Sequence, residues 1–333
     1  MRTNSKQSRL SVGFILARRF TLCAFANFVD VLRLAADEGD RSRPILCDWA
    51  VLSDNMSPVA SSCGVVVQPH ERLGDPRKFD YIVVVGGLIY ETPNLSAEYM
   101  RYLKRSVASK VPLVGVCTGT FILHRAGLMD GYRCCVSWFH HADFLEQFDG
   151  LKPISDQIFV VDRDRLTCSG GASSAHLAAY LVDKHVGRAQ SRKSLRIMII
   201  DDALQAEEPQ PGIPLNLATN DELVRKALLL MQQNIDTLLS VENIARRLGA
   251  RRRQLERHFQ QSVGMAPTLA YKVIRLEYAE FLLMHTDKTI TEIAISTGFC
   301  DCSHFIRVFR ERNGATPAAY RNSAPQNGRA TFA

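Results

Sequence analysis

The sequence lacks three features that would place it in particular classes of protein. It contains no uninterrupted apolar run of about 18 residues, the length that a membrane-spanning helix needs. Its first ten residues, MRTNSKQSRL, include no apolar segment of the signal-peptide type. Its nine cysteines are odd in number and form no C-x-x-C pair, which argues against a disulfide framework or a zinc site. We therefore expect a cytoplasmic protein with reduced, mostly buried cysteines, no cofactor, no metal and no membrane partner.

The length of the chain and one proline-rich stretch together indicate two domains. A chain of 333 residues is longer than one ordinary core supports, so two domains of about 100 to 200 residues are expected. The stretch LQAEEPQPGIPLNL, residues 204–217, holds three prolines and a glycine, which is typical of an interdomain linker. The predicted organisation is a tail at 1–10, a first domain at 11–203, a linker at 204–219, a second domain at 220–321 and a tail at 322–333.

The first domain alternates short β-branched runs with helix-like stretches. The runs are apolar enough to form strands that are buried on both faces of a sheet. This alternation predicts an α/β domain with a doubly wound, flavodoxin-like parallel sheet. The predicted strands are Val12–Ala17, Cys47–Leu52, Tyr81–Val85 and Leu113–Cys117, the predicted helices are Leu22–Glu38, Ser96–Ser109 and Ser173–Val186, and a hairpin is expected over Gln157–Cys168.

The second domain is predicted to be helical only, and it repeats itself. Ile244 and Gly249 recur as Ile293 and Gly298, an offset of 49, whereas the apolar residues that follow them recur with an offset of 50. Each copy has a short amphipathic helix, a glycine suited to a left-handed turn, and a second helix with apolar residues at i and i+4. This pattern predicts two helix-turn-helix units.

The outward positions of the two second helices are rich in side chains that can reach DNA bases and phosphates. Taken alone, such a charge run is more often a solvated helix face. The repeat, the paired apolar anchors and the G-x-x-P ends of both units favour a DNA-reading surface instead, and the net charge of +7 agrees with a polyanionic partner. The candidate residues are Arg252, Arg253, Glu256 and Arg257 in the first copy, and Cys302, Ser303, His304, Arg307 and Arg310 in the second, with Arg310 expected on a phosphate.

The motifs ITEIAISTGF, SHFIRVFR and GATPAAYR make residues 220–321 resemble the DNA-binding domain of AraC/XylS-type transcriptional regulators. The resemblance implies that a long helix, here about Pro267–Met284, joins the two units and that both enter the major groove of double-stranded promoter DNA. It also implies RNA polymerase as a partner. The base-reading positions it implies are Arg253, Glu256 and Arg257 in the first unit, and Cys302, Ser303, His304 and Arg307 in the second.

The stretch VGVCTGTFIL, residues 114–123, has the form of a nucleophile elbow, a strained turn from strand to helix that exposes its central side chain. Cys117 at a helix N-terminus is expected to favour the thiolate. In the stretch VVGGL, residues 84–88, two glycines end the preceding strand and offer backbone N–H groups. Residues 11–200 resemble the ThiJ/PfpI group of class I glutamine-amidotransferase-like domains.

The resemblance also shows which catalytic partners the chain lacks. The position of the family's histidine holds Ser137, and the position of its acidic residue holds Ala24. His140 and His141 lie a few residues past the expected place, where a surface or capping role is favoured over that of a base. We therefore predict a non-catalytic pocket that binds a ligand through Cys117, Thr118, Gly87, Leu88, Ser137, Trp138 and His176.

The combination of the two domains resembles bacterial regulators that sense small nitrogen compounds, such as amino acids and quaternary amines. The aromatic face of Trp138 suits a cationic ligand. The prediction is a transcriptional activator that responds to a small-molecule effector and forms a homodimer through its first domain. Two alternatives remain: a cysteine hydrolase or amidase fused to a DNA-binding module, and a constitutive DNA-binding protein with an inert dimerisation domain.

Overall fold

A computed structural model describes residues 10–90, 95–208, 210, 219, 221–235 and 237–323. The chain divides into two compact units, Met1–Gln210 and Pro211–Ala333. Within the described residues, we find no helix with the length and apolar character needed to cross a membrane.

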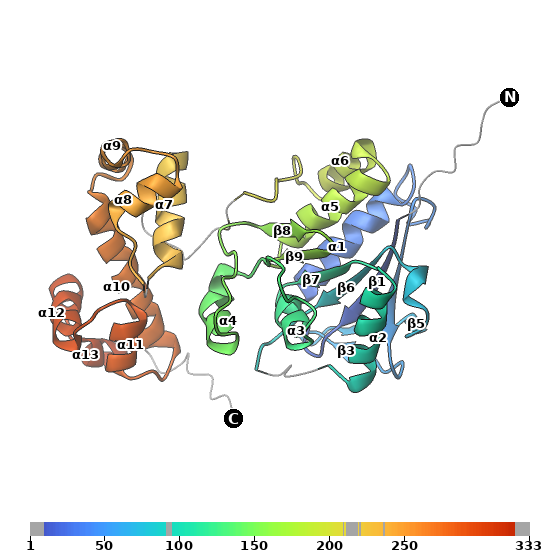
Figure 1. The fold of residues 1–333 in the computed structure, drawn as a ribbon, viewed down its shortest axis with the longest axis horizontal. Helices are drawn as coiled ribbons and strands as arrows, with labels where there is room; N and C mark the ends of the chain where they lie inside the picture. The colour runs from blue at the N-terminus through green and yellow to red at the C-terminus, as the bar shows by residue number, and fades with distance from the viewer. Residues whose placement is uncertain are drawn as a thin grey trace. The chain divides into compact units, whose positions relative to one another are not determined.

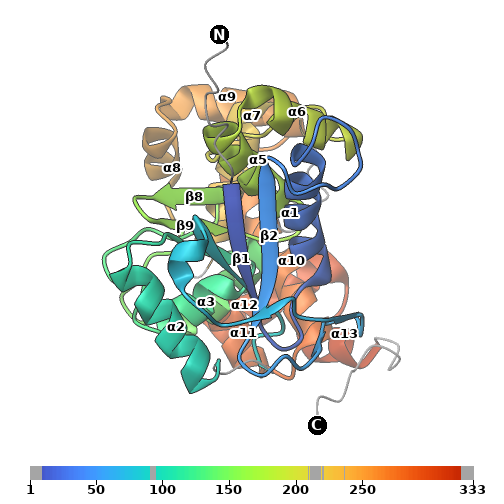
Figure 2. The same ribbon diagram turned by 90° about the vertical axis from the view of Figure 1, so that its right-hand side faces the viewer.

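The first unit is built on a seven-stranded sheet in the order β5-β2-β1-β6-β7-β9-β8 (Figures 1 and 2). All neighbours are parallel except β8 and β9, which form the predicted hairpin. The strands are β1 (Leu10–Leu16), β2 (Cys47–Ser53), β5 (Glu71–Arg72), β6 (Tyr81–Val85), β7 (Leu113–Val116), β8 (Phe159–Asp162) and β9 (Arg165–Cys168), and a separate ribbon pairs β3 (Val59–Ala60) with β4 (Val66–Val67).

Helices cover both faces of this sheet, because its strand residues point alternately into two apolar cores. Phe14 and Val83 belong to one core, whereas their neighbours Ile15 and Ile82 belong to the other. The first core is closed by α1 (Leu22–Ala35), α5 (Ser173–His185) and α6 (Arg188–Ile197), and the second by α2 (Ala97–Ala108), α3 (Gly119–Arg125) and α4 (His141–Gln147). Short 3-10 turns η1 (Pro76–Lys78) and η2 (Trp138–His140) complete the unit. The predicted doubly wound α/β class is confirmed.

The sheet order reverses next to β1, because β2 lies on one side of it and β6 on the other. Open α/β sheets bind ligands at the carboxyl ends of the strands beside such a reversal. The chain leaves β6 and β7 at this edge through Gly86 and Cys117 respectively. The candidate effector site is therefore placed at this edge of the sheet.

The segment that was predicted to begin a linker at residue 204 packs on the first unit instead. The Ile158 N–H donates to the Glu208 carbonyl at 2.9 Å, and the Leu204 N–H donates to His176 Nδ1 at 3.2 Å. Gln210 is buried against the same unit. The difference arises from side-chain and backbone hydrogen bonds that composition alone does not reveal.

All the regular elements among the described residues of the second unit are helices, as predicted. Its two apolar cores meet along α10, whose Ile274 belongs to the first and whose Leu276 belongs to the second. The single long helix therefore fixes two helix-turn-helix units on one support. The helices are α7 (Glu222–Gln233), α8 (Val241–Arg247), α9 (Arg252–Val263), α10 (Pro267–His285), α11 (Ile290–Ser296), α12 (Cys302–Asn313) and α13 (Pro317–Ser323).

Candidate DNA-reading helices and effector site

The first candidate recognition helix is α9, which is held by the buried side chains of Leu255 and Phe259. Its opposite face exposes Arg252, Arg253 and Arg257. Arg252 Nε donates to Glu256 Oε1 at 2.8 Å, so these two charges partly neutralise each other. Arg253 and Arg257 form no ion pair within the described residues and are available to a polyanion.

The second candidate recognition helix, α12, begins more firmly than α9. The Asp301 side chain accepts hydrogen bonds from the backbone N–H groups of Ser303 at 3.0 Å and His304 at 3.1 Å. Arg251 occupies the corresponding position of α9 and makes no such cap. Since an aspartate cap stabilises a helix start by about 1 kcal/mol, the start of α12 has a stabilising contact that the start of α9 lacks.

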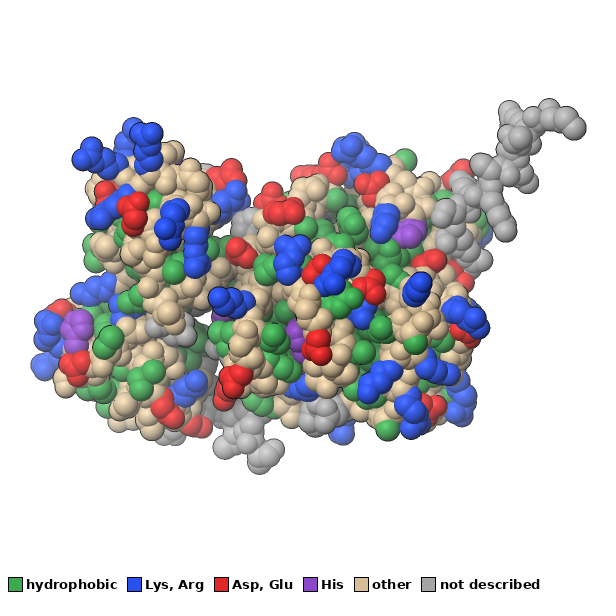
Figure 3. Space-filling model, viewed as in Figure 1, with side chains coloured by type: hydrophobic (Ala, Val, Ile, Leu, Met, Phe, Trp, Pro, Cys, Tyr) green, Lys and Arg blue, Asp and Glu red, His purple; other side chains and the backbone are tan. Residues whose placement is uncertain are grey.

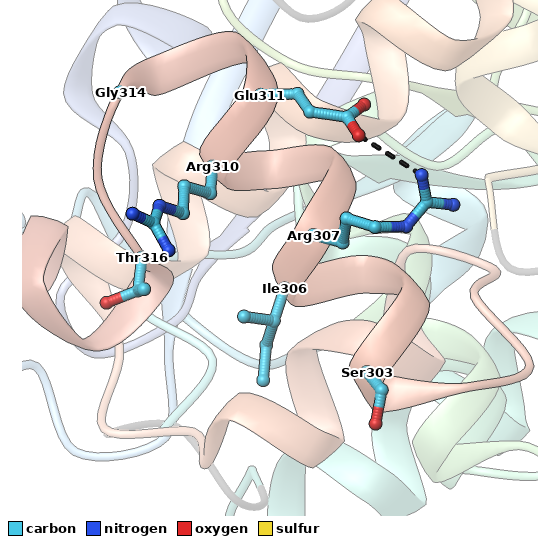
Figure 4. A pocket seen from close by; sticks show the side chains of 7 residues that line it. All are labelled: Ser303, Ile306, Arg307, Arg310, Glu311, Gly314 and Thr316. Carbon is cyan, nitrogen blue, oxygen red and sulfur yellow. Dashed lines mark hydrogen bonds and ion pairs between the residues drawn. The ribbon is translucent and has the colours of Figure 1, made fainter.

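The reading face of α12 lines a groove of about 660 Å³. Arg310 points toward Thr316, whereas Arg307 extends to another side, where its Nη1 donates to Glu311 Oε1 at 3.1 Å (Figure 4). Cys302 is only half-exposed, and its Sγ lies 3.9 Å from Thr291 Oγ1. The structure thus brings Ser303, Arg307 and Arg310 into one groove and places Cys302 beside α11.

The two reading faces are basic, with three arginines on α9 and two on α12. Figure 3 shows Lys and Arg side chains gathered over α9 and near α12. Both gatherings lie opposite apolar anchors, because Phe305 and Phe309 on α12 are buried in the same way as Leu255 and Phe259 on α9. This arrangement of a fixed inner face and a basic outer face suits contact with DNA phosphates and base edges.

Arg275 on α10 positions the second unit and was not identified from the sequence. Its Nε donates to the Thr297 carbonyl at 2.7 Å, at the end of α11, and its guanidinium lies 3.8 Å from the centre of the Phe299 ring. Burial lowers the pKa of Arg275. The sequence feature that points to Arg275 is its position between the core residues Ile274 and Leu276 of a long helix, where a solvated charge is unexpected.

In the first unit, Cys117 has the strained backbone of an elbow, with φ of 56°. The turn is possible because Gly86 and Gly119 carry no side chain where the chain segments touch. A Cβ on Gly86 would lie 2.2 Å from the Gly119 nitrogen, and one on Gly119 would lie 2.0 Å from the Val84 carbonyl oxygen. The Cys117 N–H donates to the Cys168 carbonyl at 3.1 Å. The elbow geometry therefore rests on two glycines that no other residue can replace without movement.

The expectation that Cys117 favours the thiolate is wrong. Burial raises the pKa of the Cys117 thiol, and it outweighs the lowering by the Thr21 hydroxyl and the Thr118 backbone N–H. Cys117 Sγ lies 3.4 Å from Thr21 Oγ1, and a Cβ on Gly170 would lie 3.1 Å from the same sulfur. Cys117 is half-buried beside the loops after β1 and β9, and the desolvation there exceeds the effect of the short helix behind it.

The histidines near the elbow have other partners. His140 Nδ1 lies 2.8 Å from Asp143 Oδ2, and His141 Nδ1 lies 2.8 Å from Ser155 Oγ. Ser137, at the position of the missing base, accepts a bond from the Phe139 N–H at 3.4 Å and so caps η2. Ala24, at the position of the missing acid, is fully buried.

Four of the predicted ligand residues lie together at the sheet edge. Thr118 Oγ1 donates to the Gly87 carbonyl at 2.7 Å, directly beside Cys117. The Leu88 N–H donates to the Arg19 carbonyl at 3.3 Å, and the Gly86 N–H donates to the Val116 carbonyl at 3.0 Å. These two N–H groups are therefore already used within the protein and do not serve a ligand in this arrangement.

Of the remaining predicted ligand residues, Trp138 and His176 are bonded to the segment before the interdomain connection, whereas Ser137 caps η2. The Trp138 N–H donates to Gln210 Oε1 at 2.9 Å. His176, 6% exposed, accepts from the Leu204 N–H, and burial lowers its pKa. The direct bonds of Trp138 and His176 thus lead to residues 204–210 rather than to Cys117.

Two sets of residues near the candidate site were missed in the sequence. Asn27 Nδ2 donates to the Gly171 carbonyl at 3.2 Å and to Cys23 Sγ at 3.3 Å, close to the elbow loops. Tyr90, 86% exposed, donates to Asp143 Oδ1 at 3.3 Å. Tyr90 could have been found from its position shortly after β6, where ligand-binding side chains are expected, whereas Asn27 lies inside α1 and no local pattern marks it. Among the described residues, no group of three or more metal-ligating side chains is found.

Comparison with known proteins agrees with this division of the chain. Residues 12–184 match the DJ-1/PfpI family, and residues 244–323 match a helix-turn-helix domain. The chain is 32% identical over 317 residues to the HTH-type transcriptional regulator GbdR of Pseudomonas aeruginosa, covering 95% of this chain and 85% of that one. It is 30% identical over 319 residues to the HTH-type transcriptional regulator CdhR of the same species, covering 94% and 91%.

A solved structure supports the same family assignment. The AraC family transcriptional regulator from Pseudomonas putida is 28% identical, with a TM-score of 0.50 over 57% of this chain and 99% of that one. The chain therefore belongs to the AraC-type helix-turn-helix transcriptional regulators that carry a DJ-1/PfpI domain.

Proposed function

We propose that this regulator activates transcription, reads double-stranded promoter DNA with α9 and α12, and is controlled by a small nitrogen-containing metabolite bound to its DJ-1/PfpI domain. The observation that carries the DNA-reading part is the exposure of Arg253, Arg257, Arg307 and Arg310 on two helices with buried opposite faces. Rigid helices with basic outer faces hold side chains at the depth of the major groove.

A footprint of the protein on promoter DNA tests whether α9 and α12 each contact the DNA. The DNA is selected from genomic fragments by the wild-type protein, so that no operator has to be assumed. We expect two protected segments about one helical turn apart, with Arg257→Ala weakening one and Arg307→Ala the other. Loss of both segments in either variant would contradict the assignment of one segment to each helix.

The residues around Trp138 support an effector that carries a cationic amine. The Trp138 and Phe139 rings lie perpendicular with centres 5.7 Å apart, and Phe139 is 54% exposed. The Asp143 carboxylate accepts from Tyr90 and lies 2.8 Å from His140 Nδ1, and the His140 ring centre lies 4.9 Å from that of Phe139. Aromatic faces attract a cation by about 0.5 to 2 kcal/mol each, and the carboxylate adds Coulomb attraction. An amino acid or a quaternary amine has this chemistry.

Thermal-shift measurements on the full-length protein test the effector class. The probes are the twenty common amino acids and glycine betaine, with acetate as an anion without an amine. An effector at 100 times its Kd stabilises the folded unit by about 2.7 kcal/mol, a shift of several degrees in Tm. Trp138→Ala is expected to remove that shift. A protein that no probe stabilises would support constitutive DNA binding with an inert first domain.

The second candidate function, a cysteine amidase, is favoured only by the elbow geometry of Cys117. The raised pKa of the Cys117 thiol opposes it. Cys117→Ala separates the two, with the exposed Cys63→Ala as the matched control. A regulator keeps effector-dependent transcription in both variants, whereas an amidase releases ammonia from an amide substrate and loses this turnover only in Cys117→Ala.

We also propose that the protein forms a homodimer through its DJ-1/PfpI domain and contacts RNA polymerase at the promoter. Light scattering of the full-length protein is expected to give twice the mass of one chain. A reporter fused to the selected promoter is expected to respond to the wild-type protein only when the effector is present. A monomeric mass, or a promoter that the protein represses, would contradict these two points.

A further inference from the structure

The first recognition helix, α9, is joined to α7 by a polar contact within the second unit. His258 Nδ1 lies 2.7 Å from Oδ2 of Asp221, the residue that caps α7, and the two side chains are 28% and 24% exposed. The other oxygen of Asp221 accepts from the Val224 N–H at 3.1 Å. Desolvation raises the pKa of Asp221, but the bonds from Val224 and His258 outweigh it and lower this pKa. An ionised carboxylate only accepts, so His258 Nδ1 is the donor of this bond.

His258 lies at the border of the buried face of α9. It comes three residues after Leu255 and directly before Phe259, both of which are fully buried, whereas Arg257 lies on the exposed face. Apolar contacts such as those of Leu255 and Phe259 are not directional. A hydrogen bond depends on direction and on a donor–acceptor distance of about 2.7 to 3.2 Å. The bond to Asp221 therefore adds a directional restraint on the rotation of α9 about its axis.

The second recognition helix, α12, is fixed in another way. With the repeat offset of 50, the position of His258 holds Val308, which is 3% exposed and belongs to the apolar core. The start of α12 also has the two cap bonds of Asp301, whereas Arg251 makes no such cap at the start of α9. The polar pair thus gives α9 a restraint that α12 obtains from its core and its cap.

We infer that the Asp221–His258 pair is a positioning contact, which sets the rotation of α9 about its axis and so directs Arg253 and Arg257 at base edges. The inference rests on the proposed function, because it names the residues that position the first reading helix. The surface of a helix lies about 5 to 6 Å from its axis, so a rotation of about 20° moves an outer side chain by about 2 Å. A bidentate contact of arginine with guanine does not tolerate such a shift, whereas attraction to phosphates does.

Single substitutions separate this contact from the other roles of its residues. His258→Leu removes the ring nitrogen. Asp221→Ser keeps a cap for the Val224 N–H and removes the oxygen that faces His258. His258→Asn keeps a nitrogen donor near the place of Nδ1 and is the conservative variant that retains the contact. Ile274→Val is the matched control for stability, because it removes one methyl group from the apolar core that also holds Leu255 and Phe259, and removes no hydrogen bond.

Fluorescence anisotropy of the full-length protein measures binding to the selected promoter and to two versions of it, each with one protected segment scrambled. The segment that α9 reads is the one whose protection Arg257→Ala weakens. We expect His258→Leu and Asp221→Ser to weaken binding by about fivefold or more on DNA that keeps this segment. On DNA that keeps only the other segment, the change is expected to stay within about twofold.

The remaining variants are expected to behave like the wild type or like one single variant. His258→Asn and Ile274→Val should bind every DNA within about twofold of the wild type. The double variant Asp221→Ser/His258→Leu should lose no more than either single variant, because both remove the same contact. Melting curves establish that each protein is folded, and Asp221→Ser decides if His258→Leu does not fold.

The outcomes separate this inference from the proposed function. Equal losses on both scrambled DNAs, a similar loss in Ile274→Val, or a His258→Asn protein as weak as His258→Leu would make the pair a merely structural contact and overturn the inference. Folded His258→Leu and Asp221→Ser proteins that bind like the wild type overturn it as well, while Arg257→Ala still supports reading by α9. An Arg257→Ala protein that keeps all protection contradicts the proposed role of α9, and the inference fails with it.

Discussion

Arg257 offers the sharpest test of DNA reading, because it has the same position as Arg307 in the repeat but a different neighbour. Arg307 is paired with Glu311, whereas the corresponding position of α9 holds Gln261. Arg257 therefore reaches a base without first leaving an ion pair. We expect Arg257→Ala to weaken binding to the selected promoter, and to weaken it more than binding to scrambled DNA of equal length.

The size of the effect follows from the geometry. A bidentate arginine contact with guanine contributes about 1 to 3 kcal/mol, so Arg257→Ala is expected to cost about 5- to 150-fold in affinity for the promoter. The Arg307–Glu311 pair has side chains 66% and 54% exposed, and such i,i+4 pairs are worth about 0.3 to 0.5 kcal/mol. The net loss in Arg307→Ala is thus about twofold smaller. Glu311→Gln is expected to tighten binding by a similar factor.

Fluorescence anisotropy of full-length protein at several salt concentrations measures both DNAs. Arg101→Ala is the matched control, because it removes the same charge from the exposed surface of α2 in the other domain. Each lost phosphate contact lowers the slope of log affinity against log salt by about 0.9. Equal losses on promoter and scrambled DNA after Arg257→Ala would refute its role as a base reader and make it a phosphate contact.

Three further predictions concern the stability of the units. Arg275→Ala is expected to destabilise the second unit by about 1 to 3 kcal/mol in chemical denaturation, because it removes the bond to Thr297 and the contact with Phe299; full rescue by Arg275→Lys would contradict the role of the planar guanidinium. Asp301→Ala removes the two hydrogen bonds that cap α12. Chemical denaturation followed by circular dichroism should give a free energy of unfolding that is lower by about 1 kcal/mol. Burial lowers the pKa of His124 to about 4, so between pH 6.5 and 4 the unfolded chain binds a proton that the folded chain does not, and Tm falls as the pH drops through this range. His124→Gln should make Tm less dependent on pH. An unchanged slope of Tm against pH would exclude His124 as its source.

Much of the architecture could be predicted from the periodicity of apolar residues. The predicted run Tyr81–Val85 is β6 to the residue, because a fully apolar segment of this length is stable only between two layers of helices. The two helix-turn-helix units were predictable from the recurrence of Leu255 and Phe259 as Phe305 and Phe309, since anchors at i and i+4 share one helix face.

The candidate sites were predictable in part. The exposed arginines of α9 and α12 are where the pattern placed them, because the outer face of a helix follows from its buried face. The thiolate prediction for Cys117 failed because the segments that desolvate it, around Thr21 and Gly170, are distant in the chain. The residues next to Cys117 in the sequence do not reveal the desolvation that such distant loops cause.

The amino-acid sequence by itself determined the two-unit organisation, the faces of the helices and the backbone turn at Cys117, because these depend on spacing and on residue type within one segment. Only the tertiary structure decided the state of the Cys117 thiol, the support that Arg275 gives to α11, and the anchoring of Gln210 at Trp138. Each of these depends on a partner from another element, and a hydrogen bond or a buried charge acquires its energy only when folding brings that partner within reach.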